Sequence, residues 1–326
     1  MQAILPLAGK GTRLRPLTHT CPKPLLRVAN RPVLSYILDQ LTEEGVDELI
    51  CITGHLGGQI EHYLETEYPD FTKHYVEQVQ QLGTADAIRL AKPFVDGPVL
   101  IIFVDTVFEA DLGLIRERPE LDGIIWAKEV EDYQRFGVIL TDDEGCMRQI
   151  VEKPTEPVSR LANIGVYYIR DHELMFEGIR HVMDSPPRLG EFFLTDAFQY
   201  MIDRGSRILT AEVGGWWDCG KQETLLETNR ELLLQARGRC GEADPDGELV
   251  CLDSDVAVED AELGPNVSVA AGSRIIRSRL SNSIVGAGTV IEDCDLRDSL
   301  IGDHAIVRGV SGSANVGDHT VVDAAR

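Results

Sequence analysis

The sequence predicts an α/β protein in which a doubly wound domain with a largely buried sheet precedes a small stack of parallel β coils. Three observations support this prediction. Over residues 1–237, short apolar runs alternate with amphipathic segments, as they do where helices cover both faces of a sheet. Residues 238–247 are rich in Gly, Pro and Asp, which is typical of a linker. Over residues 248–326 a short motif recurs and the helical pattern is absent.

In chain order, six apolar runs are expected to form strands. They are Ala3–Leu7, Glu48–Ile52, Val99–Val104, Gly123–Ala127, Ile164–Ile169 and Arg207–Val213. Three amphipathic segments are expected to form helices: Pro32–Glu44, Leu194–Arg204 and Glu223–Arg237. Gly45 is expected to end the first helix. In an alternating fold of this kind, the ligand site lies at the carboxyl ends of the strands.

The C-terminal region repeats an aliphatic residue, a Gly and then small or polar residues. Four such units begin at Leu263, Val285, Ile301 and Val316. Stacked units bury one another's apolar faces and form a parallel β-helix. The pattern resembles that of the hexapeptide-repeat, left-handed β-helix family. His304 and His319 follow Gly-Asp in two of the units, and we expect them to be solvated turn residues.

The composition excludes two classes of partner. The formal net charge of −23 opposes binding to nucleic acid or to an anionic membrane surface. No apolar run approaches the roughly 20 residues that span a bilayer, and the N-terminus has the features of a first strand rather than a signal peptide. The seven cysteines form no C-x-x-C pair, as expected for reduced thiols in a cytoplasm. The acidic surface suits both a salty cytoplasm and ordinary solubility, and both explanations stay open.

A Gly-rich loop follows the first expected strand. The run from Leu7 to Thr12 exposes backbone N–H groups, and its glycines let the chain approach a phosphate closely. Arg13, Arg15 and Lys23 follow, in a protein with only seven Lys residues. Cations beside such a loop are what a triphosphate requires. The residue order differs from that of a P-loop or a dinucleotide-binding fingerprint.

The longer string resembles a family signature. It reads Gly9-x-Gly11-Thr12-Arg13-Leu14-Arg15-Pro16-Leu17-Thr18, followed by Pro22-Lys23-Pro24-Leu25, and it is similar to that of the sugar-1-phosphate nucleotidyltransferases. The resemblance implies a Rossmann-like domain with a mixed sheet. It implies that Arg13 holds the β- and γ-phosphates and that Lys23 holds the α-phosphate region. The loop residues implied to bind the nucleotide are Leu7, Ala8, Gly9, Gly11 and Thr12. Leu7 departs from the family, and we expect it to alter how closely the loop approaches the nucleotide.

A second segment resembles the part of the family that reads the base. Its implied nucleotide-binding residues are Gln78, Gly83 and Thr84. A Gln amide can pair with one edge of uracil or thymine. Family members that read guanine tend to carry an acidic residue at this position, so Gln78 favours a pyrimidine.

Two carboxylates are expected to bind Mg²⁺. Asp105 follows an apolar strand, where a buried carboxylate is costly unless it is paired or coordinates a cation. Asp218 lies in Trp216-Trp217-Asp218-Cys219-Gly220, which resembles the Trp-x-Asp-x-Gly element of the family. Val104 and Cys219 depart from the family pattern, and Val104 is expected to crowd a loop that passes close to the nucleotide.

The residues implied to bind the sugar 1-phosphate are Gly137, Glu152, Lys153, Asn163 and Tyr167. Glu152 can accept hydrogen bonds from sugar hydroxyls, and Lys153 can hold the phosphate as a point charge. With Arg13 and Lys23, Lys153 completes the expected set of catalytic cations. Thr195 and Asp196 also match the family, but we expect them to cap a helix.

The resemblance implies transfer of a nucleotidyl group from dTTP or UTP to a sugar 1-phosphate, with glucose 1-phosphate as the first choice. The alternatives are an N-acetylglucosamine-1-phosphate uridylyltransferase and a mannose-1-phosphate guanylyltransferase. Asn30-Arg31-Pro32 favours the latter, whereas Gln78 opposes it. A catalytically silent regulatory or assembly paralogue is the alternative of another class. An acyltransferase built on the β-helix is disfavoured because residues 239–326 contain no Lys. We expect a cytoplasmic homo-oligomer joined through the β-helix, whose deletion would change oligomeric state more than chemistry.

Overall fold

The computed structural model describes residues 1–236 and 249–324, so the expected linker, 238–247, lies outside the described residues. By their contacts, the residues divide into two compact units. The first comprises Met1–Gly9 and Ile37–Trp216, and the second comprises Lys10–Tyr36 and the chain from Trp217 onward. Residues 10–36 therefore group with the C-terminal coils, whereas the sequence suggested one continuous N-terminal domain.

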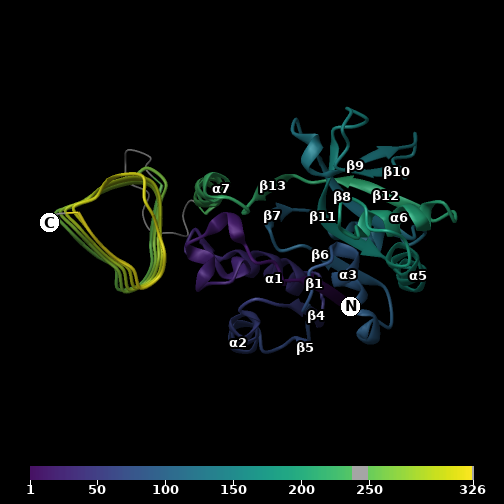
Figure 1. Ribbon diagram of the computed structural model, residues 1–326, viewed down its shortest axis with the longest axis horizontal. Coiled ribbons are helices and arrows are strands. Elements are labelled where there is room, and N and C mark those ends of the chain that lie inside the picture. The colour runs from purple at the N-terminus through teal and green to yellow at the C-terminus, as the bar shows by residue number, and fades with distance from the viewer. Residues whose placement is uncertain (237–248, 325–326) are drawn as a thin grey trace. The chain divides into compact units, whose positions relative to one another are not determined.

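The first unit is built on a nine-stranded mixed sheet (Figure 1). Its strands are β1 (Gln2–Pro6), β4 (Glu48–Thr53), β5 (Thr72–Glu77), β6 (Val99–Ile102), β8 (Gly123–Glu129), β9 (Gly137–Thr141), β10 (Met147–Glu152), β11 (Leu161–Ile169) and β12 (Ile208–Glu212). β1 lies between β4 and β6 and runs parallel to both, whereas β11 runs antiparallel to β6 and β8. All six predicted strands are present, with ends that differ by a few residues. The loops after β1, β4 and β6 consequently meet at one edge of the sheet.

Helices accompany this sheet in chain order. They are α1 (Val33–Glu43), α2 (Gly57–Glu67), α3 (Thr84–Arg89), α4 (Leu114–Glu117), α5 (His172–Met183) and α6 (Leu194–Ile202). The predicted helices α1 and α6 are confirmed. Gly45 follows α1 with φ at 72°, a left-handed conformation that Gly adopts at little cost. The sequence predicted no helix over α2, α3 or α5. Of these, α3 packs against α5 and β1, and α5 packs against α6.

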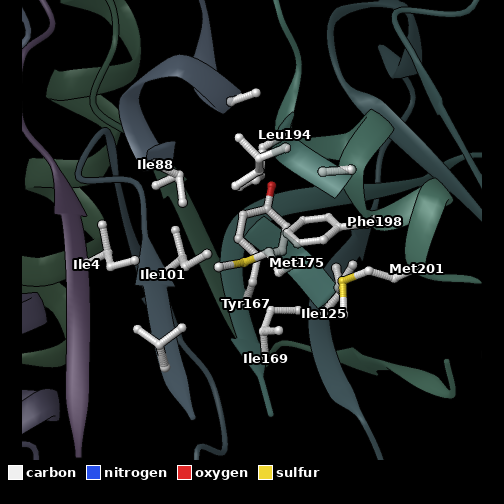
Figure 2. Close-up of a cluster of buried hydrophobic side chains, with 14 of the residues drawn as sticks. Ile4, Ile88, Ile101, Ile125, Tyr167, Ile169, Met175, Leu194, Phe198 and Met201 are labelled. Carbon is white, nitrogen blue, oxygen red and sulfur yellow. The ribbon is translucent and has the colours of Figure 1, made fainter. Parts of the chain in front are cut away.

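The main core lies where α3, α5 and α6 pack on the sheet. Figure 2 shows Leu194, Phe198 and Met201 of α6 beside side chains of the sheet strands, among them Ile101 and Tyr167. The side chain of Tyr167 is 3% exposed, and its ring lies 4.9 Å from that of Phe198. The apolar core therefore fixes the positions from which β11 presents its remaining side chains.

The second unit contains α7 (Gln222–Gln235) and two parallel sheets that form stacked coils (Figure 1). One sheet holds β14 (Val250–Leu252), β16 (Glu262–Leu263), β17 (Val267–Val269), β19 (Arg279–Val285), β21 (Asp295–Ile301), β23 (Ser311–Gly312) and β24 (Asn315–Val316). The other holds β15 (Ala257–Glu259), β18 (Arg274–Ile276), β20 (Val290–Glu292), β22 (Ile306–Arg308) and β25 (Val321–Asp323). We call residues 250–323 the coil stack. The expected helix over α7 is confirmed as far as the described residues reach.

The coils stack in parallel with a repeat of fifteen to seventeen residues. Val267 pairs with Ser283, and Ser283 pairs with Ser299, each sixteen residues on. The first coil is one residue longer, because Val250 pairs with Val267, and the last is one residue shorter, because Ile301 pairs with Val316. Aliphatic side chains such as Val285 and Ile301 fill the interior of the stack. His304 and His319 are exposed, as predicted, with their rings stacked 5.1 Å apart on neighbouring coils.

Two predicted absences can be compared with the described residues. No disulfide joins the cysteines that the structure describes. None of the helices within residues 1–236 and 249–324 combines the length and the apolar character needed to cross a bilayer.

Candidate active site

The backbone after β1 begins the expected nucleotide loop. Leu7 extends the strand by donating its N–H to the carbonyl of Ile52 at 2.7 Å, and its side chain is only 2% exposed. Leu7 therefore fills the core, and the exposed part of the loop begins at Gly9. The buried Ala8 accepts a hydrogen bond from Gln81 Nε2 through its carbonyl oxygen. Gln81 thus ties the base-reading segment to the loop.

The side-chain amide of Gln78 is held in one orientation. Its Nε2 donates to Asp86 Oδ2 at 3.0 Å, and the two residues are 8% and 3% exposed. Asp86 Oδ1 in turn accepts from Arg89 Nη2 at 2.8 Å. Because an ion-paired carboxylate only accepts hydrogen bonds, the amino end of the Gln78 amide must face Asp86. The carbonyl oxygen of Gln78, an acceptor, then points away from Asp86.

Gly83 is required by the close approach of two backbone segments. Its φ is 125° and its ψ is 179°, a conformation essentially confined to Gly. A Cβ at this position would lie 2.4 Å from the carbonyl oxygen of Phe192. Phe192 also bonds through its backbone to Leu82 and Ala85, at 2.9 Å each. The base-reading segment is therefore fastened to the chain just before α6.

Thr84 caps α6 from a distance in sequence. Its Oγ1 accepts from the backbone N–H of Leu194, the first residue of the helix, at 2.8 Å. The expectation that Thr195 or Asp196 caps this helix is wrong. Thr195 Oγ1 donates to Glu152 at 3.1 Å, and Asp196 pairs with Arg188. Because Thr84 caps the helix, the hydroxyl of Thr195 is able to bond to Glu152, one of the residues expected to bind the sugar.

The predicted sugar residues Gly137, Glu152 and Asn163 come together around Thr195. Gly137 pairs with Glu152 across β9 and β10, and its carbonyl accepts from Asn163 Nδ2 at 2.9 Å. A Cβ at position 137 would lie 2.5 Å from Asn163 Nδ2 and 2.8 Å from Glu152 Oε2. Only Gly leaves room for these two polar groups to converge, and their amide and carboxylate match the donors and acceptors of sugar hydroxyls.

Tyr167 lies in the core and holds the side chain of Asn163. Its hydroxyl donates to Asn163 Oδ1 at 2.5 Å, and its ring lies among the core side chains in Figure 2. Burial raises the pKa of Tyr167 well above its usual range, so the hydroxyl keeps its proton and donates it to Asn163. Tyr167 therefore orients the side chain of Asn163 through this hydrogen bond.

The pKa of Glu152 is raised, chiefly because burial disfavours the charged form. The hydrogen bond from Thr195 and the charge of Lys153 oppose this effect. Lys153 is exposed, and its ammonium lies 5.0 Å above the ring of Phe193. A carboxylate with a raised pKa and a nearby ammonium suit a ligand that offers both hydroxyls and a phosphate.

Asp105 lies in the turn between β6 and β7 (Thr106–Glu109) and is half-buried. The preceding strand ends earlier than predicted, at Ile102, and Phe103 then donates its N–H to Gly165 at 2.9 Å. Val104 is 4% exposed, so its side chain is buried and does not crowd the exposed side of this loop.

The second unit contains the continuation of the loop. Gly11 has φ at 59°, and a Cβ there would lie 2.9 Å from Thr18 Cγ2 and 3.2 Å from Lys23 Cβ. Thr18 Oγ1 also donates to the Gly11 carbonyl at 2.8 Å. Gly11 therefore lets the chain fold tightly against Lys23, whereas Thr12 and Arg13 remain exposed.

Arg13 lies near the predicted metal ligand Asp218. A Cβ at Gly220 would be 2.7 Å from Asp218 Oδ1 and 3.4 Å from Arg13 Nη2. Gly220 N donates to Asp218 Oδ1 at 2.7 Å, and Thr228 Oγ1 donates to the Asp218 carbonyl at 3.1 Å. These bonds fix the carboxylate of Asp218 beside a guanidinium that is exposed to solvent.

The donor set fits a hard cation. Within the described residues, no group of three or more His, Cys, Asp or Glu side chains gathers as a metal cage. Carboxylate oxygens such as those of Asp105 and Asp218 are ligands that suit Mg²⁺, which also takes phosphate oxygens and waters. The two residues belong to different units, so their use of one common ion stays a prediction.

Three residues that the structure adds to the site are Gln81, Asp86 and Thr195. Each acts on a predicted residue: Gln81 on Ala8, Asp86 on Gln78, and Thr195 on Glu152. Gln81 lies inside the segment that resembles the base-reading part of the family, where no role was assigned to it, and Thr195 was expected only to cap a helix. Asp86 carried no signal, because an acid at the start of a helix has an ordinary explanation in the helix dipole.

Comparisons with known proteins show the family and the fold of this chain. A family model described as nucleotidyl transferase matches residues 2–235. The low-salt glycan biosynthesis nucleotidyltransferase Agl11 of Haloferax volcanii is 34% identical, and the match covers 93% of this chain and 92% of that protein. A glucose-1-phosphate thymidylyltransferase of Streptomyces griseus is 31% identical, over 95% of this chain and 88% of that protein. The crystal structure of a UDP-glucose pyrophosphorylase complexed with UDP-glucose superimposes with a TM-score of 0.64 at 25% identity, covering 72% of this chain and 98% of that one.

Proposed function

The chain belongs to the nucleotidyl transferase family, and we propose that it transfers a nucleotidyl group from a pyrimidine triphosphate to a sugar 1-phosphate. The observation that carries this proposal is the convergence of polar side chains at Gly137. A missing Cβ there admits an amide and a carboxylate within 2.5 and 2.8 Å of one point. That arrangement suits sugar hydroxyls, and it is accompanied by an exposed ammonium for a phosphate. Pyrophosphate is the second product.

The choice of a pyrimidine rests on Gln78. Uracil and thymine present an N3–H donor, which the fixed carbonyl oxygen of Gln78 can accept. In cytosine N3 is unprotonated and is itself an acceptor, so it could not form a hydrogen bond with the carbonyl oxygen of Gln78. The Gln78–Asp86 hydrogen bond therefore favours UTP or dTTP over CTP. Guanine also carries an N–H on its pairing edge, so exclusion of GTP depends on the size of the pocket.

The choice of sugar rests on likeness. Glucose 1-phosphate is the first choice because the Streptomyces griseus relative is named for it. N-acetylglucosamine 1-phosphate with UTP and mannose 1-phosphate with GTP are the alternatives. A catalytically silent paralogue is the alternative of another class. The presence of Arg13, Lys23, Asp105, Lys153 and Asp218 opposes silence, since these are the charged groups that the chemistry requires.

The proposed reaction is an in-line displacement at the α-phosphorus. An oxygen of the sugar 1-phosphate, already ionised near pH 7, forms the new P–O bond while the bond to pyrophosphate breaks. No protein nucleophile or general base is required. The protein has to bring two polyanions together, and Arg13, Lys23 and Lys153 neutralise and orient them. Mg²⁺ held by Asp105 and Asp218 would supply charge stabilisation of the phosphate oxygens.

We interpret the coil stack as a left-handed β-helix that joins subunits of a cytoplasmic homo-oligomer. Its parallel strands and its repeat of fifteen to seventeen residues support a β-helix. Outward aliphatic side chains of one sheet support a contact with another subunit, because Val290, Ile306 and Val321 pair in one row and Val321 is 62% exposed. Solution mass measured by light scattering tests this, and a monomer at micromolar concentration would contradict it.

The test of the function is pyrophosphate release with Mg²⁺. UTP, dTTP, CTP, GTP and ATP are each paired with the 1-phosphates of glucose, N-acetylglucosamine and mannose. We expect turnover with UTP or dTTP and one sugar, and mass spectrometry of the product identifies the nucleotide sugar. Folded protein that is inactive with all fifteen pairs would favour the silent paralogue instead.

A further inference from the structure

We propose that the coil stack positions the segment that grips the triphosphate, and that Asn229 of α7 is the positioning residue that joins them. We call Lys10–Tyr36 the phosphate segment, because it carries Arg13 and Lys23. What this segment binds rests on the proposed function. Its attachment to the coil stack rests on contacts within the second unit alone.

One outer face of the coil stack is covered. In its larger sheet, Ser268 pairs with Ile284, and Ile284 pairs with Leu300. Their neighbours in sequence, such as Val285, point into the interior of the stack, so these three point outward. Yet Ser268 is 0%, Ile284 7% and Leu300 1% exposed. Because these outward side chains are almost inaccessible to solvent, another part of the chain must cover this face of the stack.

The phosphate segment and α7 provide the cover. A narrow cavity at this face is lined by Leu17, Cys21 and Leu25 of the phosphate segment, Leu225 of α7, and Ile284 and Leu300 of the stack. Apolar contacts of this kind are non-directional. They hold the segment against the stack, but they do not define its backbone position to a fraction of an ångström.

Asn229 provides directional hydrogen bonds between the phosphate segment and the coil stack. It is 0% exposed, and its Oδ1 accepts two hydrogen bonds, from Ala29 N at 2.8 Å and from Ser268 Oγ at 2.7 Å. Its Nδ2 lies 3.4 Å from the carbonyl oxygen of Asn266. One buried amide therefore bonds at once to the phosphate segment and to the coil stack, where no water competes for its hydrogen bonds.

Two other residues of the phosphate segment, one on each side of Lys23, also bond to the stack. Asn30 Nδ2 donates to the carbonyls of Cys251 and Val269, at 3.0 Å each. Thr20 Oγ1 donates to Asp318 Oδ2 at 2.7 Å. The stretch from Thr20 to Asn30 is thus fixed at each end, and Lys23 lies between the two anchors.

This geometry gives the coil stack a part in substrate binding. Lys23 packs closely against Gly11 of the Gly-rich loop. The hydrogen bonds of Asn229, Asn30 and Thr20 hold the backbone around Lys23 in this position. A loosened anchor would let the segment sample positions in which its cations miss the phosphates. Binding of the triphosphate would then have to restore the order, which lowers its affinity. Residues 37–216, which carry the sugar pocket, contain none of these anchors.

The test compares matched variants of the full-length protein. Asn229→Ala removes the amide, and Ser268→Ala removes only the hydrogen bond that the amide accepts from Ser268. The control is Ser273→Ala: Ser273 is also a fully buried serine of the stack, but it bonds only within the stack, to Gly286 and Thr289. Steady-state pyrophosphate release gives KM for each substrate, and hydrogen–deuterium exchange reports on the backbone of residues 15–30.

We expect Asn229→Ala to raise KM for the triphosphate about tenfold and to leave KM for the sugar 1-phosphate within about twofold. Ser268→Ala should raise the first KM about two- to threefold. Both variants should speed exchange at Ala29, and Ser273→Ala should lower the melting temperature without either change. Should Asn229→Ala fail to fold, Ser268→Ala decides the question.

Two results would overturn the proposal. One is an unchanged KM for the triphosphate in a folded Asn229→Ala protein. The other is an equal rise of both KM values in all three variants, which would make the stack a merely structural support. If the wild type has no activity with any substrate pair, the proposed function fails. The exchange comparison between Asn229→Ala and Ser273→Ala then still accepts or rejects the coupling.

Discussion

Replacing Asp86 with Asn should relax the choice between pyrimidine bases. In the wild type, Asp86 accepts the hydrogen bond from Gln78 Nε2 at 3.0 Å, which fixes the carbonyl oxygen of Gln78 as an acceptor. An Asn side chain at position 86 either accepts or donates, so the Gln78 amide can turn round and present its N–H groups. A turned amide suits the bare N3 of cytosine.

The magnitude follows from burial. Gln78 is 8% and Asp86 3% exposed, so water does not relieve a mismatched pair. A buried donor or acceptor left without a partner costs about 1–3 kcal/mol, which is about 5- to 150-fold in kcat/KM. We therefore expect the wild type to prefer UTP over CTP by a factor in that range, and Asp86→Asn to reduce the preference to about fivefold or less.

The assay is the ratio of kcat/KM for UTP and CTP, measured by pyrophosphate release at saturating sugar 1-phosphate. Arg89→Gln is the control, because Arg89 is 48% exposed and its removal leaves the carboxylate of Asp86 in place as an acceptor. It should keep the wild-type ratio. An unchanged ratio in an active Asp86→Asn protein, or equal loss in Arg89→Gln, would refute the orientation argument.

Four other substitutions test the remaining features of the site. Asp105→Asn and Asp218→Asn should each lower kcat by about 10²-fold or more, since a metal clamp would be lost; activity within a few-fold of wild type in either variant contradicts the metal assignment. Gly83→Ala should destabilise the fold by at least about 1–3 kcal/mol, because its Cβ would lie 2.4 Å from the Phe192 carbonyl, and thermal melting measures the loss. Glu152→Gln should raise the unfolding free energy at pH 7. Burial raises the pKa of Glu152 in the folded state, so the folded protein binds more protons than the unfolded chain, and stability falls as pH rises through that raised value. The gain should vanish below the ordinary value of 4.5, and a gain that is independent of pH in urea titrations would contradict the shift.

The sequence predicted much of the first unit because its signals are local. Buried strands are visible as apolar runs, and Gly45 stands where the backbone takes a left-handed conformation. Strand ends were less certain: the run Val99–Val104 is apolar throughout, but β6 ends at Ile102, since pairing with β11 decides where a strand stops. Short helices such as α3 were missed because they carry too few turns to show a period.

The assignment of polar side chains was harder, because hydrogen-bond partners are set by folding. Thr84 matched a nucleotide-binding string, yet its hydroxyl caps α6. Thr195 had the composition of a helix cap, yet it donates to Glu152. In both cases the residue that the hydroxyl contacts lies 43 or more positions away along the chain.

The sequence by itself identified the family, six strands of the first sheet, the helices α1, α6 and α7, and the charged residues that are proposed to carry the chemistry. These follow from short motifs and from the periodicity of apolar residues, which are local properties of the sequence and do not depend on tertiary contacts. Only the tertiary structure decided which way the Gln78 amide faces, that Tyr167 serves Asn163, and that the phosphate segment packs on the coil stack. Ala29 and Asn229 are 200 residues apart in sequence, and no local pattern encodes a hydrogen bond that exists only after both segments have packed.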